Sequence, residues 1–420
     1  MIQTIDLLPG VTLRCFPDRR FKQSCLSIQL VRPHCREEAA MNALIPAVLL
    51  RGTKTAPDLR AITLRLDDLY GASVGALVRR VGDLQTTGFY CNFIADRYTM
   101  GGEALLEPMV EFVRQLLLEP VTENGVFRKD LVQSEKKNLI STLQTQLNDK
   151  RAYASNQLLR SMCRKDSFGI PRLGRVQEVR RITPASLYDH YRKILRQSRV
   201  DLFYVGPQKP EKIAQVLTGL FAGLDRCPEA LPAQTAYRVC PGRELTEHMD
   251  VTQGKLALGY YTPITTRHPD FAAMQVLSSL FGSGMTSKLF QNIREKQSLC
   301  YDISASYFGS KGILTVNAGI DFHKEVSVRE EIETQLDNCR KGRITPEELA
   351  AAKASICSSL TGTHDSPGGI EGYYASGALS GNRLSPAEYI RAVQAVTVAD
   401  CARVAQTLRY HTGFFLKGDA

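Results

Sequence analysis

The chain contains no tryptophan and no long hydrophobic run, and several familiar motifs are absent as well. A membrane-spanning helix needs about 18 consecutive apolar residues, and no stretch of the sequence approaches that length. No GxGxxG or P-loop motif occurs, which argues against a nucleotide-binding protein. The N-terminus, MIQTIDLLPGVTLRC, has no basic segment followed by an apolar core, so we expect a cytoplasmic protein without a membrane partner.

The cysteines form no CxxC pair, although the chain has 11 of them. Cys15, Cys25 and Cys35 are evenly spaced, but their spacing matches neither a zinc knuckle nor a redox motif. We therefore expect reduced, mostly buried thiols in a reducing compartment.

The net charge of +10 is spread along the chain. The basic clusters are short, as at Arg19 and Arg20 or at Arg180 and Arg181, and no nucleic-acid-binding module is recognisable. A solvated basic surface is favoured over nucleic-acid binding, and attraction to acidic peptides or to an acidic partner protein stays open.

The chain is too long for one average domain, and it repeats itself faintly. Leu50–Thr53 resembles Leu280–Ser283, and Asp130–Ser141 resembles Glu348–Ser359, in the same order. Between the copies, the segment RCPEALPAQTAYRVCPGREL has three prolines and no helical period. These features predict two similar halves, residues 1–226 and 243–420, joined by a linker at 227–242.

Strand and helix patterns alternate irregularly in both halves. Ser24–Val31 and Lys255–Tyr261 carry β-like apolar residues, whereas Ala104–Leu118, Asp270–Leu280 and Pro346–Leu360 have helical patterns. This mixture predicts an α+β fold, with two α/β sandwich halves whose mixed or antiparallel sheets are covered by helices, rather than a doubly wound parallel sheet.

The most informative segment is FGSGMTSKLFQNIREKQSLCY, which ends at Tyr301. Its small residues Gly282, Ser283 and Gly284 would let a ligand backbone approach closely, because glycine has no Cβ. Arg294 can donate a fork of hydrogen bonds to a carbonyl or carboxylate, and Tyr301 adds a hydroxyl. The alternative is a tight turn followed by a surface arginine and a packed tyrosine.

This segment, together with the repeated halves, resembles the M16 family of zinc metallopeptidases, which includes mitochondrial processing peptidase and pitrilysin-type enzymes. The resemblance covers nearly the whole chain and implies two homologous halves around a peptide-binding chamber. In the family, the first half normally has the zinc motif HxxEH, and the second half has a glycine-rich loop and an Arg/Tyr pair.

The zinc motif is degenerate here. Aligning Leu49–Thr53 with the family segment that follows HxxEH places the motif at Ala43, Pro46 and Ala47, so that alanines replace both histidines and proline replaces the glutamate. Zinc requires imidazole or carboxylate ligands, and these side chains supply none. Pro46 also predicts a disturbed helix if the helix begins much earlier in the chain, because its ring would clash with the carbonyl of Asn42.

The third metal ligand is absent too. Glu135-Lys-Lys-Asn resembles the family stretch that precedes the metal-binding glutamate, and the position of that glutamate is Thr142. We expect Glu135 to be a structural carboxylate. No two histidines lie one helical turn apart, so no helix presents a histidine pair to a metal, and we expect no cofactor in this chain.

The resemblance implies a non-catalytic subunit that forms a heterodimer with an HxxEH-bearing homologue, which would hold the zinc. Arg294 and Tyr301 would then contact the carbonyl or tetrahedral oxyanion of a peptide or unfolded protein segment, with Gly282, Ser283 and Gly284 along its backbone. Lys288 and Lys296 are expected to face solvent, and the alternative is that they attract acidic or C-terminal groups of the peptide.

Two alternatives stay open: a structural or assembly module with the M16 fold, and a peptide-binding clamp without cleavage. The paired bacterial members of the family include a branch associated with modification of elongation factor P. No motif identifies the substrate, so membership of that branch is also an open alternative.

Overall fold

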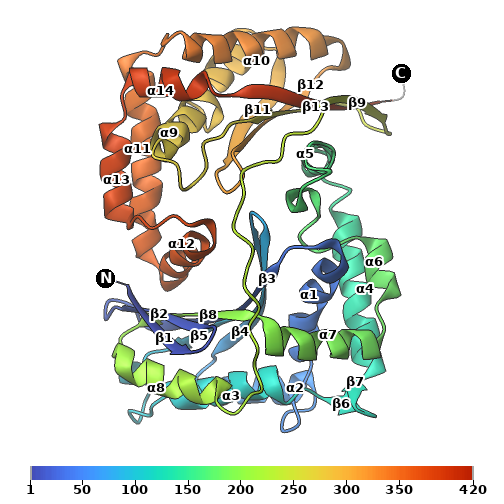
Figure 1. Cartoon of the computed structure of the whole chain (residues 1–420), viewed down its shortest axis with the longest axis vertical. Helices are drawn as coiled ribbons and strands as arrows, with labels where there is room; N and C mark the ends of the chain where they lie inside the picture. Colours follow the sequence, from blue (N-terminus) through green and yellow to red (C-terminus); the bar gives the residue numbers. More distant parts are fainter. Residues whose placement is uncertain (1, 419–420) are drawn as a thin grey trace. The chain divides into compact units, whose positions relative to one another are not determined.

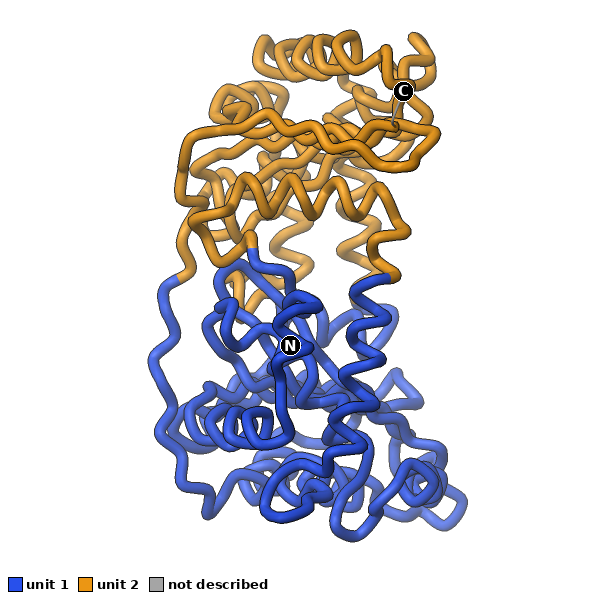
Figure 2. Tube along the Cα trace, turned by 90° about the vertical axis from the view of Figure 1, so that its right-hand side faces the viewer, with its two compact units in different colours: residues 1–144, 170–233, 364–376 blue, residues 145–169, 234–363, 377–420 orange. Residues whose placement is uncertain are grey.

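A computed structural model describes residues 2–418, which form two compact units (Figure 2). Unit 1 comprises the described residues up to 144 together with 170–233 and 364–376. Unit 2 comprises 145–169, 234–363 and the described residues from 377 onward. Each unit contains one mixed sheet with helices packed on it, so the predicted α+β fold is confirmed.

The sheet of unit 1 has six strands in the order β1-β2-β8-β3-β5-β4 (Figure 1). Only the β2/β8 pair is parallel, and the other neighbours are antiparallel. The strands are β1 (Gln3–Leu8), β2 (Val11–Pro17), β3 (Gln23–Pro33), β4 (Ser73–Val81), β5 (Leu84–Ile94) and β8 (Arg199–Gly206), and a separate hairpin joins β6 (Thr122–Glu123) to β7 (Val126–Phe127).

Alternation along β3 explains how this sheet is covered on both faces. Leu26, Ile28 and Leu30 point to one face and join the main apolar core, while Cys25 and Ser27 point to the other face. The helices of unit 1 that come from the first half of the sequence are α1 (Arg36–Leu49), α2 (Leu59–Asp68), α3 (Leu106–Leu118), α4 (Lys129–Thr145), α6 (Val176–Arg181), α7 (Pro184–Gln197) and α8 (Pro210–Phe221).

The sheet of unit 2 repeats this topology without the first strand. Its order, β9-β13-β10-β12-β11, matches β2-β8-β3-β5-β4 in chain order and in the direction of every neighbouring pair. The strands are β9 (Arg243–His248), β10 (Gly254–Tyr261), β11 (Cys300–Phe308), β12 (Ile313–Ile320) and β13 (Arg409–Lys417). The helices of the second half of the sequence are α9 (Phe271–Gly282), α10 (Glu325–Arg340), α11 (Pro346–Gly362), α12 (Pro367–Ser380), α13 (Pro386–Ala395) and α14 (Val398–Ala405).

The compact units are not the two contiguous halves, because each unit includes a helix from the other half of the sequence. Helix α5 (Lys150–Met162) packs on β10 and β13 of unit 2, and most of α12 packs on the sheet of unit 1 (Figure 1). Helix α5 is the third α-helix after β5 in the first half of the sequence. Helix α12 is the third α-helix after β12, the equivalent strand of the second half. The exchange is therefore reciprocal. The predicted linker, 227–242, contains no helix or strand.

An ion pair with a buried carboxylate anchors each exchanged segment. Glu371 of α12 accepts hydrogen bonds from Arg79, at 2.7 and 2.8 Å, and from Ser27 at 2.7 Å. Asp166, which follows α5, lies 3.0 Å from Lys311, and both side chains are almost fully buried. Because an unpaired buried charge is costly, these pairs fix where the exchanged segments dock.

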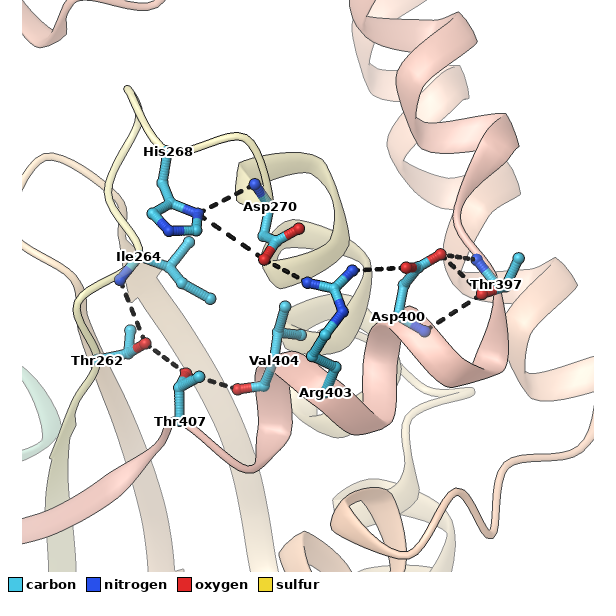
Figure 3. Close-up of polar contacts among 9 residues, drawn as sticks. All are labelled: Thr262, Ile264, His268, Asp270, Thr397, Asp400, Arg403, Val404 and Thr407. Atoms are coloured by element: carbon cyan, nitrogen blue, oxygen red, sulfur yellow. Dashed lines mark hydrogen bonds and ion pairs between the residues drawn. The ribbon is translucent and has the colours of Figure 1, made fainter.

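Helix α9 of unit 2 begins in a polar network (Figure 3). Arg403 of α14 donates to Asp270, just before α9, and to Asp400 at 2.6 Å. Asp400 also accepts from Thr397, which completes the capping box of α14. His268 accepts the Asp270 N–H through Nδ1 at 3.1 Å. The network fixes the start of α9, whose other end carries the glycine loop.

Pro46 does not interrupt its helix, contrary to the sequence prediction. Helix α1 runs unbroken from Arg36 to Leu49. A residue other than proline at position 46 would donate its backbone N–H to the carbonyl of Asn42. That carbonyl instead accepts a hydrogen bond from the Thr87 hydroxyl of β5 at 2.6 Å. The Asn42 side chain donates to Gln85 at 3.0 Å and bonds His190 Nε2 at 2.8 Å. The Thr87 hydrogen bond therefore replaces the missing helical hydrogen bond.

This compensation predicts a coupling between Thr87 and Pro46. Thr87→Val should lower the free energy of unfolding by about 1–3 kcal/mol, since it leaves the Asn42 carbonyl buried without a donor. The same change in the Pro46→Ala background should cost less, because alanine restores the backbone donor. Urea denaturation of the wild type and the three variants measures this coupling. Equal costs of Thr87→Val in both backgrounds would contradict the assignment.

His190 predicts a loss of stability in mild acid. Burial lowers the pKa of His190 to about 4 from the ordinary 6.5. As the pH falls below 6.5, the unfolded chain therefore takes up a proton that the folded chain rejects until about pH 4. The free energy of unfolding should fall by about 2 kcal/mol between pH 7 and pH 5 on account of this residue.

The measurement is urea denaturation at both pH values for the wild type and His190→Gln. The variant should lose most of this pH dependence, because glutamine does not titrate. His323→Gln, at an exposed histidine, controls for the substitution itself. A pH dependence in His190→Gln as steep as in the wild type would assign the effect to other groups.

Candidate functional site

The glycine loop follows directly from the close packing of α9 on β11. Gly282, the last residue of α9, is buried, and a Cβ at this position would lie 2.4 Å from the Cβ of Ala305. Ser283 donates to the carbonyl of Ala305 at 3.3 Å. Gly284 has a φ of +88° and open space around its Cα, so the chain turns away from the sheet there. Ser283 and Gly284 are exposed, and Gly282 is not.

Arg294 lies on a π-helical turn, Phe290–Lys296, with its guanidinium over the ring of Phe290 at 4.7 Å. Its closest carboxylate is that of Glu295, 3.8 Å from Nε, and its side chain is 42% exposed. Stacking on Phe290 restricts the guanidinium without using its N–H groups. Arg294 therefore presents hydrogen-bond donors to a ligand.

The π-helical turn reverses into β11 through a strained residue. Ser298 has a φ of +52°, a conformation that costs a residue other than glycine about 1–2 kcal/mol. The Ser298 N–H bonds the Arg294 carbonyl at 3.1 Å, and the Leu299 N–H bonds the Ile293 carbonyl at 3.0 Å. The reversal brings the start of β11 next to Arg294.

Tyr301 is the extra residue of a β-bulge. In the β11/β12 ladder, Cys300 pairs with Ile320 and Asp302 pairs with Gly319, so Tyr301 has no partner of its own. A bulge of this kind redirects the side chain of the unpaired residue. The Tyr301 side chain is 57% exposed, and its hydroxyl donates to Asp321 Oδ1 at 2.7 Å.

Asp321 and Lys324 complete the polar group around Tyr301. Lys324 lies 3.0 Å from Asp321 and also donates to the Ser298 carbonyl at 3.2 Å. The hydrogen bond to Asp321 raises the pKa of Tyr301 above its ordinary value. The bonds from Tyr301 and Lys324 lower the pKa of Asp321. At neutral pH, Tyr301 is therefore protonated and Asp321 is ionised.

Arg294 and Tyr301, which the sequence predicted as a pair, line one pocket of about 340 Å³ in unit 2. The lining residues are Arg294, Glu295, Ser298, Leu299, Cys300, Tyr301 and Lys324. Burial raises the pKa of Cys300 to about 11, so this thiol is no nucleophile at neutral pH. The pocket offers hydrogen-bonding and ionic contacts rather than covalent chemistry.

One further sequence expectation differs from the structure, and two residues of the site were not predicted. Lys288 was expected to face solvent, but it is buried and pairs with Glu348 at 2.8 Å; Lys296 is exposed. No sequence pattern indicated Asp321 or Lys324. They belong to the segment after β12, and only the pairing of β11 with β12 brings them to Tyr301.

The degenerate metal positions lie in unit 1. Ala43 and Pro46 are buried in α1, Ala47 is half-buried, and Thr142 is exposed on α4, where its hydroxyl bonds the Asn138 carbonyl. These side chains offer no imidazole or carboxylate to a metal. Within residues 2–418, no group of three or more His, Cys, Asp or Glu side chains is arranged to hold a metal ion.

Glu135 has a structural environment. Its carboxylate lies 3.3 Å from Arg51 and accepts a hydrogen bond from Asn138 at 3.2 Å. The side chain is largely buried on α4. These contacts are those of an ion pair within unit 1 and agree with the structural role expected for Glu135.

Comparison with known proteins identifies the fold. Residues 181–356 match the peptidase M16 inactive domain. The chain is 29% identical over 412 residues to the probable inactive metalloprotease YmfF of Bacillus subtilis, a match covering 97% of this chain and 96% of YmfF. It is also 29% identical over 119 residues, 28% of this chain and 29% of the relative, to YmxG, an uncharacterized zinc protease of the same organism.

Solved structures agree. A conserved protein from Enterococcus faecalis has a TM-score of 0.93 at 29% identity, covering 100% of this chain and 99% of that one. A peptidase M16 inactive domain from Pseudomonas fluorescens has a TM-score of 0.81 at 18% identity, covering 100% and 98%, which shows the fold alone. None of the helices in the described part of the chain combines the length and apolar composition needed to cross a membrane. The domain match, the near full-length relative and the shared fold make this chain similar to M16-like proteins of the inactive type.

Proposed function

We propose that this chain is the zinc-less subunit of a heterodimeric M16-type peptidase. It supplies Arg294, Tyr301 and the exposed residues Ser283 and Gly284 to a peptide bound at the zinc site of an HxxEH-bearing partner. The observation that carries the proposal is that Arg294 and Tyr301 are both exposed and line the same pocket.

The absence of ligand chemistry in α1 supports this division of labour. Ala43, Pro46 and Ala47 leave that helix without a metal ligand or a general base, so hydrolysis needs zinc and a carboxylate from another polypeptide. Bacillus subtilis has one relative named as a probable inactive metalloprotease and another named as a zinc protease. A pair of one inactive and one zinc-bearing protein is what the proposal requires.

Polar contacts of this type contribute most when they strengthen in the transition state. A guanidinium fixed by stacking loses little freedom when it binds a developing negative charge, so its contribution appears mainly in kcat. The loop at Ser283 and Gly284 offers backbone groups with little steric hindrance, which suits an extended peptide.

The proposal predicts that Arg294→Ala lowers the kcat of the assembled complex by about 10²–10³-fold, and that Tyr301→Phe lowers kcat/KM by about tenfold. Assembly should be unchanged, because both side chains are exposed. Lys296→Ala, on the same helical turn but outside the pocket, is the matched control. Peptidase assays after co-purification with the HxxEH partner provide the measurement. Normal turnover by a fully assembled double variant would exclude the catalytic-support role.

The structural alternative has its own support and a separate outcome. A chain of the Candida albicans complex III₂ shares this fold with a TM-score of 0.76 at 15% identity. If the present chain were an assembly module, it would co-purify in a large complex without peptidase activity. A clamp without cleavage would instead bind peptides in the absence of any zinc-bearing partner.

A further inference from the structure

The Tyr301 hydroxyl already uses its proton in a hydrogen bond within the chain. The hydroxyl donates to Asp321 at 2.7 Å, a length typical of a hydrogen bond to an ionised oxygen. A carboxylate can only accept, so the proton lies between Tyr301 and Asp321. Lys324, 3.0 Å from the other carboxylate oxygen, holds Asp321 in this orientation. The exposed side of the Tyr301 oxygen therefore carries lone pairs and no donor.

Arg294 has the opposite character. A guanidinium has N–H donors and no acceptor, and stacking on Phe290 restricts its plane. The pocket therefore presents one fixed donor group and one fixed acceptor. This pair is the complement of a peptide backbone, which has a carbonyl acceptor and an N–H donor.

The charges around the pocket favour a neutral ligand over an anion. Arg294 and Lys324 are accompanied by Glu295, which lines the pocket, and by Asp321, so the four formal charges balance. A free carboxylate would bind Arg294 but would face the lone pairs of Tyr301. A backbone amide satisfies both groups.

We propose that Asp321 is a positioning residue that fixes Tyr301 as a hydrogen-bond acceptor, so that the pocket binds an extended peptide through a carbonyl at Arg294 and an N–H at Tyr301. The identification of the ligand as a peptide rests on the proposed function, whereas the orientation of the Tyr301 hydroxyl does not. The raised pKa of Tyr301 and the lowered pKa of Asp321 keep this arrangement in place at neutral pH.

The orientation is tested on the isolated chain by NMR titration of tyrosines labelled with ¹³C at the ζ carbon. The Tyr301 signal, assigned by its loss in Tyr301→Phe, should titrate above the ordinary value near 10. In Asp321→Asn its pKa should move toward 10. The same pKa in Asp321→Asn as in the wild type would overturn the positioning role.

The chain offers a matched control in unit 1. The Tyr70 hydroxyl donates to Glu103 at 2.8 Å, and this exposed pair resembles Tyr301 and Asp321. Glu103→Gln should shift the Tyr70 signal and leave Tyr301 unchanged. A shift of Tyr301 in Glu103→Gln as large as in Asp321→Asn would mean that the effect is general electrostatics, and would also overturn the positioning role.

The acceptor role is tested with peptides that lack one N–H. The probe is the tightest-binding sequence from an array of unstructured peptides, resynthesised with fluorescein and with a backbone N-methyl group at each position in turn. For the wild-type chain, fluorescence anisotropy should show one position at which N-methylation weakens binding by about five- to tenfold. N-methylation at that position should no longer weaken binding to Tyr301→Phe, and it should weaken binding to Asp321→Asn much less than to the wild type.

The possible failures are distinguishable. Peptide binding with the same N-methyl pattern in the wild type and in Tyr301→Phe would overturn the acceptor role and leave the proposed function standing. Failure of the wild-type chain to bind any array peptide, alone or with its zinc-bearing partner, would overturn the proposed function and the peptide ligand together. In that case the NMR titration still decides whether Asp321 orients Tyr301.

Discussion

The antiparallel pairing of β11 with β12 determines the geometry of the candidate site. Cys300 pairs with Ile320 and Asp302 pairs with Gly319, so the ladder leaves Tyr301 as an unpaired residue and places Asp321 within hydrogen-bond distance of it. A shift of the register by one residue would turn Tyr301 to the other face of the sheet. The hydrogen bond of Tyr301 to Asp321, and with it the bridge from Asp321 through Lys324 to Ser298, depends on this register.

The strand pair β11/β12 belongs to a sheet whose topology is repeated in unit 1. Each unit also includes one helix from the other half of the sequence. The sheets share the order and direction of five strands, and α5 and α12 occupy equivalent places in the two halves of the sequence. The exchanged segments dock through buried carboxylates, Glu371 paired with Arg79 and Asp166 paired with Lys311. Apolar packing alone tolerates sliding, whereas a buried ion pair permits one position, so these pairs specify the exchange more than they stabilise it.

Local patterns were sufficient for those features that depend on neighbouring residues. The α+β class, the strands at Ser24–Val31 and Lys255–Tyr261, and the joint location of Arg294 and Tyr301 follow from spacing along a short stretch of chain. Features that depend on distant segments were missed. Pro46 is tolerated because Thr87 supplies a donor from β5, and Lys288 is buried because Glu348 of α11 meets it. Neither partner has a sequence signal that links it to its contact.

Two segments of this chain resemble the parts of an M16-type site, and they differ in structural character. The expected metal positions lie in α1, which is a regular helix, and the one carbonyl that Pro46 leaves unbonded has another donor. The segment from Gly282 to Tyr301, in contrast, combines a close helix–strand contact, a π-helical turn, a serine with positive φ and a bulge. The π-helical turn, the positive φ and the bulge are each less regular than an ordinary helix or strand, and irregularity of this kind is typical of functional sites. Together with the close contact of α9 on β11, they bring Arg294 and Tyr301 to one pocket.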